Sequence, residues 1–275
     1  MRRQWRTGNS EERRQPVIVL FFGDIVGQQA TEYLGKRLGS LRDEHRADLV
    51  IANAENCAPD GLGLTEWQAD ALLAGGVDVI TGGNHSWDSP DSVRALDNPR
   101  VLRPFNLAPG VPGRGSLTLD VAGEPVTVLN LADACAMKTV RATAGRFRPA
   151  FEGWRDADRR GTVIVDYHGD HVLEKQIFAR TVDGEAAAVL GTHTHEATLP
   201  LHILPGGTAF VTDVGMTGPA GGVQGFDPGL FVDGMRGSGN PFAFGVPGLA
   251  TGETVLGAVR LEIEHGKTVR LERLS

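Results

Sequence analysis

Length, composition and charge limit the classes of protein this chain can be. Its 275 residues suffice for one large α/β domain or two small ones, and its 41% hydrophobic content is ordinary for a soluble globular protein. A formal net charge of -7 argues against a general nucleic-acid coat, which usually has a basic footprint. Two cysteines are too few for a disulfide framework, and no apolar stretch approaches the roughly 20 residues of a membrane span, so we expect a cytoplasmic protein without a membrane partner.

The first part of the chain alternates between buried-strand and helical patterns. Short apolar runs that end in polar residues predict strands within residues 16–24, 47–56 and 77–85. Apolar residues at helical spacing predict helices within residues 30–45 and 65–76. The second helix opens with a capping-box pattern from Thr65 to Gln68. This strand–helix rhythm predicts a parallel sheet.

The second part of the chain mixes hairpins with further buried strands. Alternating or apolar runs predict a hairpin at 115–133, strands within 161–170 and 186–197, a strand pair at 199–213 and a closing hairpin at 254–274. Residues 214–249 are rich in Gly and Pro and are predicted to form a long ordered loop with little regular structure. Residues 1–15 are predicted to be a disordered tail, and residues 16–275 a single domain. Two stacked mixed sheets with helices outside fit this order.

Polar side chains of metal-ligand type follow five of the predicted strands. They are Asp24, Glu55 with Asn56, Asn84 with His85, His168, and His193 with His195. Sites in open α/β sheets form beyond the carboxyl ends of the strands, so neighbouring strands would bring these groups together. So much polarity in one cavity calls for a cation, and oxygen and imidazole donors without thiolate suit Mn, Fe or Zn. Glu55 is the candidate bridge between two ions.

Each motif alone also has a plain structural explanation. "GDIVG" is compatible with a simple turn, "NAEN" with a satisfied polar loop, and His168 with a packed core histidine. In "GTHTH", the spacing of His193 and His195 puts both rings on one face only if the backbone stays extended. The five motifs in this order favour metal binding over the separate explanations.

The set of motifs resembles the metallophosphoesterase (calcineurin-like) superfamily, and within it the YmdB-type bacterial phosphoesterases. The resemblance rests on "GDIVG", "NAEN", "GNHSWD", "VDYH", "GTHTH" and "GGTAFVTDVGMTGP", and it covers nearly all of residues 17–263. It implies a four-layer α/β/β/α sandwich of two stacked mixed sheets, a two-metal centre and hydrolysis of 2′,3′-cyclic nucleotides.

The resemblance assigns roles to the matching positions of this chain. Asp24 and His195 match ligands of the first metal, Asn56 matches the neighbouring amide ligand, and Glu55 matches the bridging carboxylate. Asn84, His168 and His193 match ligands of the second metal. His85 matches the histidine that protonates the leaving group.

Two departures from the family pattern stand out. Many superfamily members carry a histidine two residues after the first aspartate, where this chain has Val26. The segment after the central histidine usually reads like "HAEATSEK" but is "HGDHVLEK" here. The altered residues Asp170 and His171 are therefore expected to line the rim of the site and to tune substrate choice.

The chemistry implied is in-line attack on a small phosphodiester by a metal-bridging hydroxide, with His85 as general acid. A phosphomonoesterase or protein phosphatase on the same metals is the alternative among enzymes. A non-catalytic regulatory protein that binds metal or nucleotide is the alternative outside them. "GDIVGQQA" lacks the G-x-G-x-x-G spacing, which argues against a dinucleotide-binding oxidoreductase. No stable nucleic-acid partner is expected, and homo-oligomerisation is left open.

Overall fold

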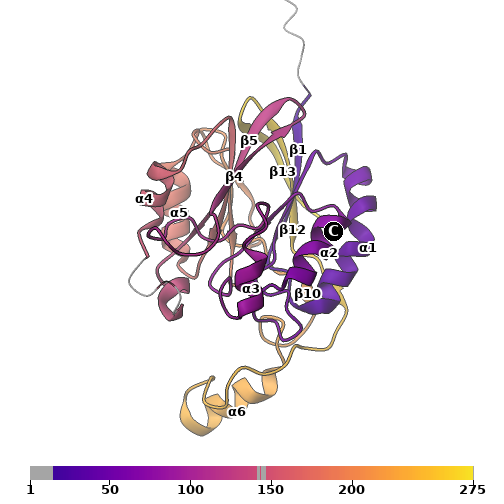
Figure 1. The fold of residues 1–275 in the computed structure, drawn as a ribbon, viewed down its shortest axis with the longest axis vertical. Helices are drawn as coiled ribbons and strands as arrows, with labels where there is room; N and C mark the ends of the chain where they lie inside the picture. The colour runs from indigo at the N-terminus through magenta and orange to yellow at the C-terminus, as the bar shows by residue number, and fades with distance from the viewer. Residues whose placement is uncertain (1–14, 141–142, 144–146, 275) are drawn as a thin grey trace, which may run out of the picture.

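A computed structural model describes residues 15–140, 143 and 147–274 of the chain. The predicted tail therefore lies outside the described residues except for Gln15. Two large sheets and the helices on their outer faces make up most of the described structure (Figure 1). No helix among the described residues is both long enough and apolar enough to cross a membrane.

The first sheet has five strands in the order β13-β12-β1-β2-β3. Their bounds are β1 Val17–Phe22, β2 Leu49–Asn53, β3 Val79–Thr81, β12 Ala258–Glu264 and β13 Lys267–Arg273. Strands β1, β2 and β3 run parallel, and the closing hairpin β12–β13 joins the sheet antiparallel to β1. The predicted parallel strands and the closing hairpin are confirmed.

The second sheet has six strands in the order β4-β5-β6-β7-β9-β8. Their bounds are β4 Ser116–Val121, β5 Glu124–Ala132, β6 Thr162–His168, β7 Ala188–Thr192, β8 His202–Ile203 and β9 Ala209–Val211. Strands β5, β6, β7 and β9 are parallel, while β4 and β8 are antiparallel edge strands. Both sheets are therefore mixed, as the sequence predicts.

The two sheets pack face to face, and helices cover both outer faces (Figure 1). The period of two along β1 shows how one strand serves two layers: Val19 and Phe21 pack against the second sheet, while Leu20 and Phe22 face the helices. Every residue of β1 is buried, which is why the run is continuously apolar. The predicted four-layer α/β/β/α sandwich is confirmed.

The four covering helices are α1 Gly27–His45, α2 Glu66–Gly75, α4 Ala150–Asp156 and α5 Val172–Thr181. Helices α1 and α2 cover the first sheet, and α4 and α5 cover the second (Figure 1). Thr65 and Gln68 form the predicted capping box at the start of α2. Arg46 and Gly76, both in the left-handed conformation, end α1 and α2.

The prediction for residues 214–249 is wrong in part. Strand β10 Gly218–Pro219 and helix α6 Pro228–Ser238 lie within this segment. The elements not yet named elsewhere in the chain are α3 Pro90–Ala95, the 3-10 helix η1 Ala136–Thr139 and β11 Thr254–Val255. Helix α6 lies inside the supposed loop and projects from the body of the molecule (Figure 1). Asp227 caps it by accepting from the backbone N–H of Gly229, and Pro228 occupies its first turn. Its glycines hide the helical pattern, because glycine is a poor helix former.

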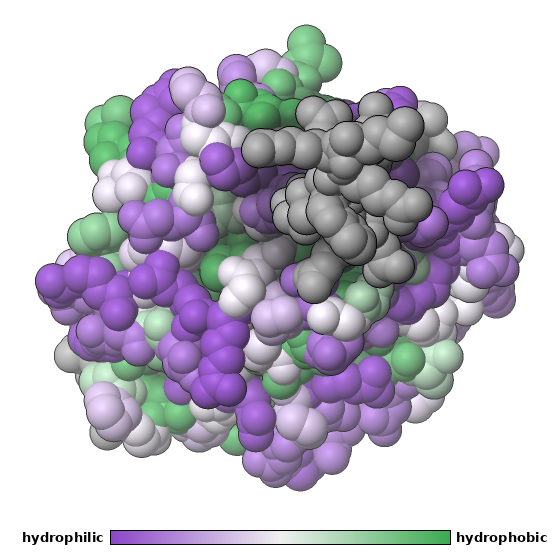
Figure 2. Space-filling model, turned by 90° about the horizontal axis from the view of Figure 1, so that it is seen from above, coloured by the Kyte–Doolittle hydropathy of each residue, from purple (hydrophilic) through white to green (hydrophobic). Residues whose placement is uncertain are grey.

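The two ends of the sandwich differ in character. Figure 2 looks onto the end at which β1 begins, where hydrophilic side chains predominate and smaller hydrophobic patches lie between them. The opposite end is where the parallel strands finish. The predicted ligands lie at that end: His168 closes β6, and the others follow β1, β2, β3 and β7 by one to three residues.

Candidate metal centre

The centre of the site is a cluster of one carboxylate and two imidazoles, of which Glu55 and His168 are buried and His193 is half-buried. Glu55, His168 and His193 each offer one ligand atom, and these atoms lie within 4.8 Å of one another. His168 Nε2 lies 3.1 Å from Glu55 Oε1 and 2.9 Å from Asn84 Oδ1. The rings of His168 and His193 meet edge to face at 4.6 Å between centroids. One cation fits among these donors.

A second set of donors lies beside the first. Asp24 Oδ1 is 3.9 Å from His195 Nε2 and 3.9 Å from His168 Nδ1. His195 Nδ1 bonds the backbone carbonyl of Gln224 at 2.8 Å, so this nitrogen carries the proton and Nε2 keeps its lone pair toward Asp24. Asp24 Oδ2 accepts from the backbone N–H of His193 at 3.0 Å, which leaves Oδ1 for another partner.

Two buried oxygens of this second set have no hydrogen-bond partner among the described residues: Asp24 Oδ1 and Asn56 Oδ1. The amide nitrogen of Asn56 donates to the carbonyl of Gly61 at 2.7 Å, so the amide oxygen is turned away from that bond. A buried acceptor without a partner costs about 1–3 kcal/mol, more if charged. A cation is a partner that such an oxygen can take, and the residues present therefore fit a metal-ion pair.

The electrostatics of the cluster favour positive charge. Burial opposes ionisation of Glu55, but the charge of His168 and their hydrogen bond hold the pKa of Glu55 well below its usual range. Burial likewise opposes a charge on His168, yet Glu55 and Asp24 raise the pKa of His168 to about 9. The oxygens around His168 thus attract a proton, as they would attract a metal ion.

His85 occupies a different position from the candidate ligand histidines. Its backbone N–H donates to Glu55 Oε2 at 3.0 Å, while its ring Nδ1 lies 2.5 Å from Asp88 Oδ2. Burial lowers the pKa of His85, but the hydrogen bond to Asp88 and the charge of Glu55 outweigh it and raise that pKa overall. The His85 side chain is 26% exposed, so the ring reaches the mouth of the site. A protonated imidazole held by a carboxylate suits a proton donor.

Gly83 explains how the chain passes so close to the ligands. A Cβ at this position would lie 2.2 Å from His168 Nε2 and 2.4 Å from Glu55 Oε2. Only glycine permits this approach of the backbone. The sequence "GGNH" signals such a close approach.

The turn that carries His193 and His195 is not extended. Strand β7 ends at Thr192, and the two histidines have φ values of 97° and 63°. Non-glycine residues seldom adopt this left-handed region, and they persist there when the surroundings hold them. The condition of an extended backbone is therefore not met: the turn just beyond the strand, and not the strand, orients both rings.

A buried ion pair that sequence reasoning missed holds this turn. Lys175 Nζ donates to the carbonyl of Thr192 at 2.8 Å and lies 3.5 Å from Asp213 Oδ2. The same carboxylate oxygen accepts from the backbone N–H of Thr194 at 3.0 Å. The pair therefore holds the backbone by hydrogen bonds to Thr192 and Thr194, one on each side of His193. A lysine in the first turns of a helix gives no sequence signal of such a role, whereas Asp213 at the end of β9 follows the strand-end pattern.

The two rim residues differ in what they contact. Asp170 is 57% exposed, and its Oδ1 lies 3.3 Å from His193 Nε2. His171 is exposed and is the N-cap of α5, where its Nδ1 accepts from the backbone N–H of Glu174 at 3.1 Å. Asp170 therefore borders the ligand cluster, while the contact seen for His171 belongs to the helix.

Replacing each rim residue should have a different effect. His171→Ala is expected to lower the free energy of unfolding by about 0.5–2 kcal/mol, the usual cost of a lost N-cap, and His171→Asn should restore it. Asp170→Ala is expected to change the ratio of turnover between two phosphoesters without altering stability. Urea unfolding and paired kinetic assays would measure both. A changed substrate ratio in His171→Asn at full stability would instead place His171 on the substrate.

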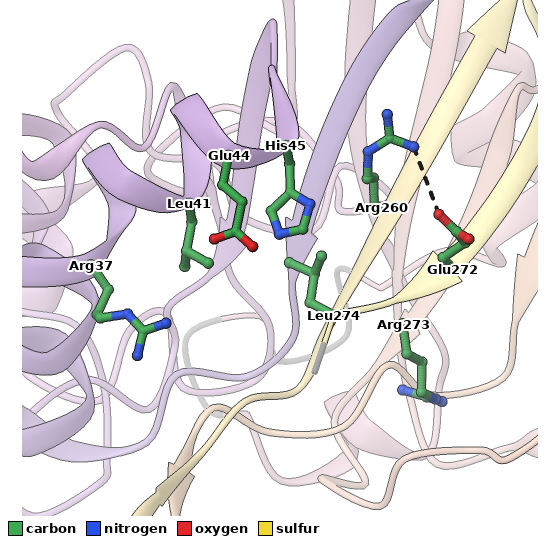
Figure 3. A pocket seen from close by; sticks show the side chains of 8 residues that line it. All are labelled: Arg37, Leu41, Glu44, His45, Arg260, Glu272, Arg273 and Leu274. Carbon is green, nitrogen blue, oxygen red and sulfur yellow. Dashed lines mark ion pairs between the residues drawn. The ribbon is translucent and has the colours of Figure 1, made fainter.

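A second hollow lies between helix α1 and strands β12 and β13 of the first sheet, and arginine side chains line much of it (Figure 3). It is lined by Arg37, Leu41, Glu44, His45, Arg260, Glu272, Arg273 and Leu274. Arg260 Nη1 lies 2.6 Å from Glu262 Oε1 and 3.9 Å from Glu272 Oε2. Arg273 donates to the carbonyls of Val214 and Thr198. Because these guanidinium groups are already partnered, the strand-end cluster is the stronger candidate for catalysis.

Comparisons with known proteins agree with this choice. The sequence model of a family described as "YmdB-like protein" matches residues 20–274. A curated 2′,3′-cyclic-nucleotide 2′-phosphodiesterase of Bacillus subtilis (strain 168) is 35% identical over 260 residues, which cover 93% of this chain and 96% of the relative.

Two solved structures are similar over nearly the whole chain. A hypothetical protein from Thermus thermophilus has a TM-score of 0.81 and 34% identity, covering 93% of this chain and 97% of its own. A structure described as a novel phosphatase of Mycoplasma pneumoniae has a TM-score of 0.83 and 29% identity, covering 94% of this chain and 92% of its own.

Proposed function

This chain belongs to the YmdB-like protein family and is a phosphoesterase, and we propose that it hydrolyses 2′,3′-cyclic nucleotides at a pair of metal ions. The observation that carries the proposal is the pair of unpartnered buried oxygens, Asp24 Oδ1 and Asn56 Oδ1, beside the Glu55 cluster. The substrate class is supported by the name of the Bacillus subtilis relative.

The donors divide into two ligand sets that share one carboxylate. The first is Asp24, Glu55, Asn56 and His195, and the second is Glu55, Asn84, His168 and His193. Glu55 is assigned to both sets because its position matches the bridging carboxylate of the family; its Oε1 lies 3.1 Å from His168 Nε2, and its Oε2 accepts from the backbone N–H of His85. Oxygen and imidazole donors favour Fe or Mn, with Zn as the alternative. Cys57 is buried and Cys135 exposed, and neither belongs to the cluster.

When bound, such ions would neutralise the charge of the phosphate and lower the pKa of a bound water to about 7. The residues of the chain then supply position and proton. His85, held at Nδ1 by Asp88, donates a proton to the leaving oxygen. Gly83 leaves the space that the ligands and substrate need. Because a cyclic 2′,3′-phosphate is strained, opening its ring requires little beyond charge neutralisation, a positioned water and this proton.

The first test combines metal analysis with a substrate comparison. Protein purified without chelator is expected to hold about two transition-metal ions per chain by elemental analysis. It should hydrolyse 2′,3′-cyclic AMP faster than a nitrophenyl phosphate monoester or a phosphoserine peptide. Chelation should remove both metal and turnover, and added Mn²⁺ should restore them.

The outcomes separate the alternatives. A single ion per chain would defeat the shared role of Glu55. Preference for the monoester would make the protein a phosphomonoesterase, in keeping with the phosphatase structure from Mycoplasma pneumoniae. Two bound ions without turnover of any of the three substrates would favour a non-catalytic metal-binding protein.

A further inference from the structure

A buried carboxylate that takes no direct part in the ligand sets lies behind the metal centre. Asp166 of β6 is fully buried and accepts three hydrogen bonds from side chains of three other strands. Its Oδ2 accepts from Thr81 Oγ1 at 2.5 Å and from Asn53 Nδ2 at 3.0 Å, and its Oδ1 accepts from Thr192 Oγ1 at 2.7 Å. A carboxylate surrounded by three donors is an acceptor in all of these bonds.

The orientation of Asn53 supports this direction of the bonds. The backbone N–H of Glu55 donates to Asn53 Oδ1 at 3.2 Å, so the amide nitrogen of Asn53 must face the other way, toward Asp166. Asn53 therefore donates to the carboxylate. The network joins the two sheets directly beneath the ligands.

The hydroxyl of Thr192 connects Asp166 to His168, a proposed metal ligand. A hydroxyl has one proton to donate, and that of Thr192 is used in the bond to Asp166. Toward His168, whose Nδ1 lies 3.0 Å from Thr192 Oγ1, only a lone pair remains. His168 Nδ1 must then carry a proton and donate it. A neutral imidazole protonated at Nδ1 has its lone pair on Nε2.

The lone pair on Nε2 faces the place where a cation is needed. His168 Nε2 lies 2.9 Å from Asn84 Oδ1 and 3.1 Å from Glu55 Oε1. Without a metal ion, a proton on Nε2 occupies this place and makes the hydrogen bond to Glu55, and a bound cation would replace that proton. The opposite tautomer would place N–H there and would exclude a metal ion.

We propose that Asp166 and Thr192 are positioning residues that fix the tautomer of His168 and so create the metal-binding nitrogen of that ring. The proposal rests on the metal centre of the proposed function but not on its substrate. Partners of this kind generally change metal affinity by 10–100-fold when removed.

The test uses Zn²⁺ alone as the probe, so that it needs no substrate. Thr192→Val keeps the shape of the side chain but removes the hydroxyl, and it is expected to weaken one of the two Zn²⁺ affinities by about 10–100-fold in competition with a chelating dye. Thr192→Ser restores the hydroxyl and should bind like the wild type. Thr208→Val, which removes another fully buried hydroxyl that donates to the carbonyl of Ala186, is the control and should keep full Zn²⁺ affinity.

A spectrum of the unaltered protein tests the same idea without any variant. In the Zn²⁺-loaded chain labelled with ¹⁵N-histidine, His168 should show a proton on Nδ1 and none on Nε2. The proposal is overturned if Nδ1 of His168 carries no proton, or if Thr192→Val binds Zn²⁺ as tightly as Thr208→Val does. If the protein does not hydrolyse cyclic nucleotides, the proposed substrate class is wrong, but the role of Thr192 in Zn²⁺ binding is still tested by these measurements.

Discussion

Replacing Gly83 by alanine is expected to disrupt the metal centre. The new Cβ would lie 2.2 Å from His168 Nε2 and 2.4 Å from Glu55 Oε2, and real side chains do not approach other atoms so closely. Either the two ligands or the backbone before Asn84 must move by about an ångström. A displacement of that size typically costs about 10²-fold in turnover. Metal content by elemental analysis and turnover of the reconstituted protein would measure the loss.

Gly39→Ala is the matched control for this substitution. It adds the same methyl group to an exposed position of α1, where nothing lies within 4 Å of the added atom. Exchange of glycine for alanine inside a helix should raise the free energy of unfolding by about 1 kcal/mol and leave metal and turnover unchanged. Two bound ions and normal turnover in Gly83→Ala would show that His168 and Glu55 do not meet in front of this glycine.

The sequence predicts that the candidate ligands lie close together, because the fold brings strand ends together. Asp24, Asn84 and His168 each follow or close a parallel strand whose apolar run is visible in the sequence. Parallel strands that share a sheet finish at the same edge, so a polar residue at each end implies a cluster. His168 closes a strand of the second sheet, so its place in the cluster also depends on how the two sheets pack against each other.

The supporting residues are harder to predict because their role depends on tertiary contacts. Asp166 appears in the sequence as a polar interruption of the run "VIVDYH", which signals a buried polar group but not its three donors. Lys175 comes from a helix and reaches the turn after β7 only through packing. The left-handed backbone of His193 is likewise imposed by contacts far away in the chain, such as Asp213 beside Thr194.

Helix α6 shows a different limit of sequence reasoning. Asp227 and Pro228 are a normal helix start, yet three glycines among the eleven residues of the helix outweigh that signal. The helix also buries little: Leu230, Val232 and Met235 remain exposed. An apolar periodicity that faces a core is what makes most helices predictable. A helix that projects from the body lacks it.

His85 separates an enzyme from a metal-binding protein, and its replacement should affect turnover alone. The His85 ring contacts Asp88 through Nδ1, and only the backbone of His85 touches the candidate ligand Glu55. His85→Ala is therefore expected to keep two ions bound. Turnover of a substrate with a poor leaving group should fall by about 10²–10⁴-fold, the usual span for a lost general acid. Elemental analysis and steady-state kinetics on 2′,3′-cyclic AMP would measure both.

The leaving group provides the internal control for this prediction. A nitrophenolate leaves without help from an acid, so a nitrophenyl phosphodiester should lose much less of its turnover in His85→Ala. His195→Ala should instead lower the metal content, because Nε2 of that ring faces the unpartnered oxygen of Asp24 at 3.9 Å. If His85→Ala loses metal as His195→Ala does, then His85 is a ligand and the proton comes from another group. If it keeps its metal and loses equal turnover on both leaving groups, His85 binds the phosphate and does not protonate the leaving oxygen.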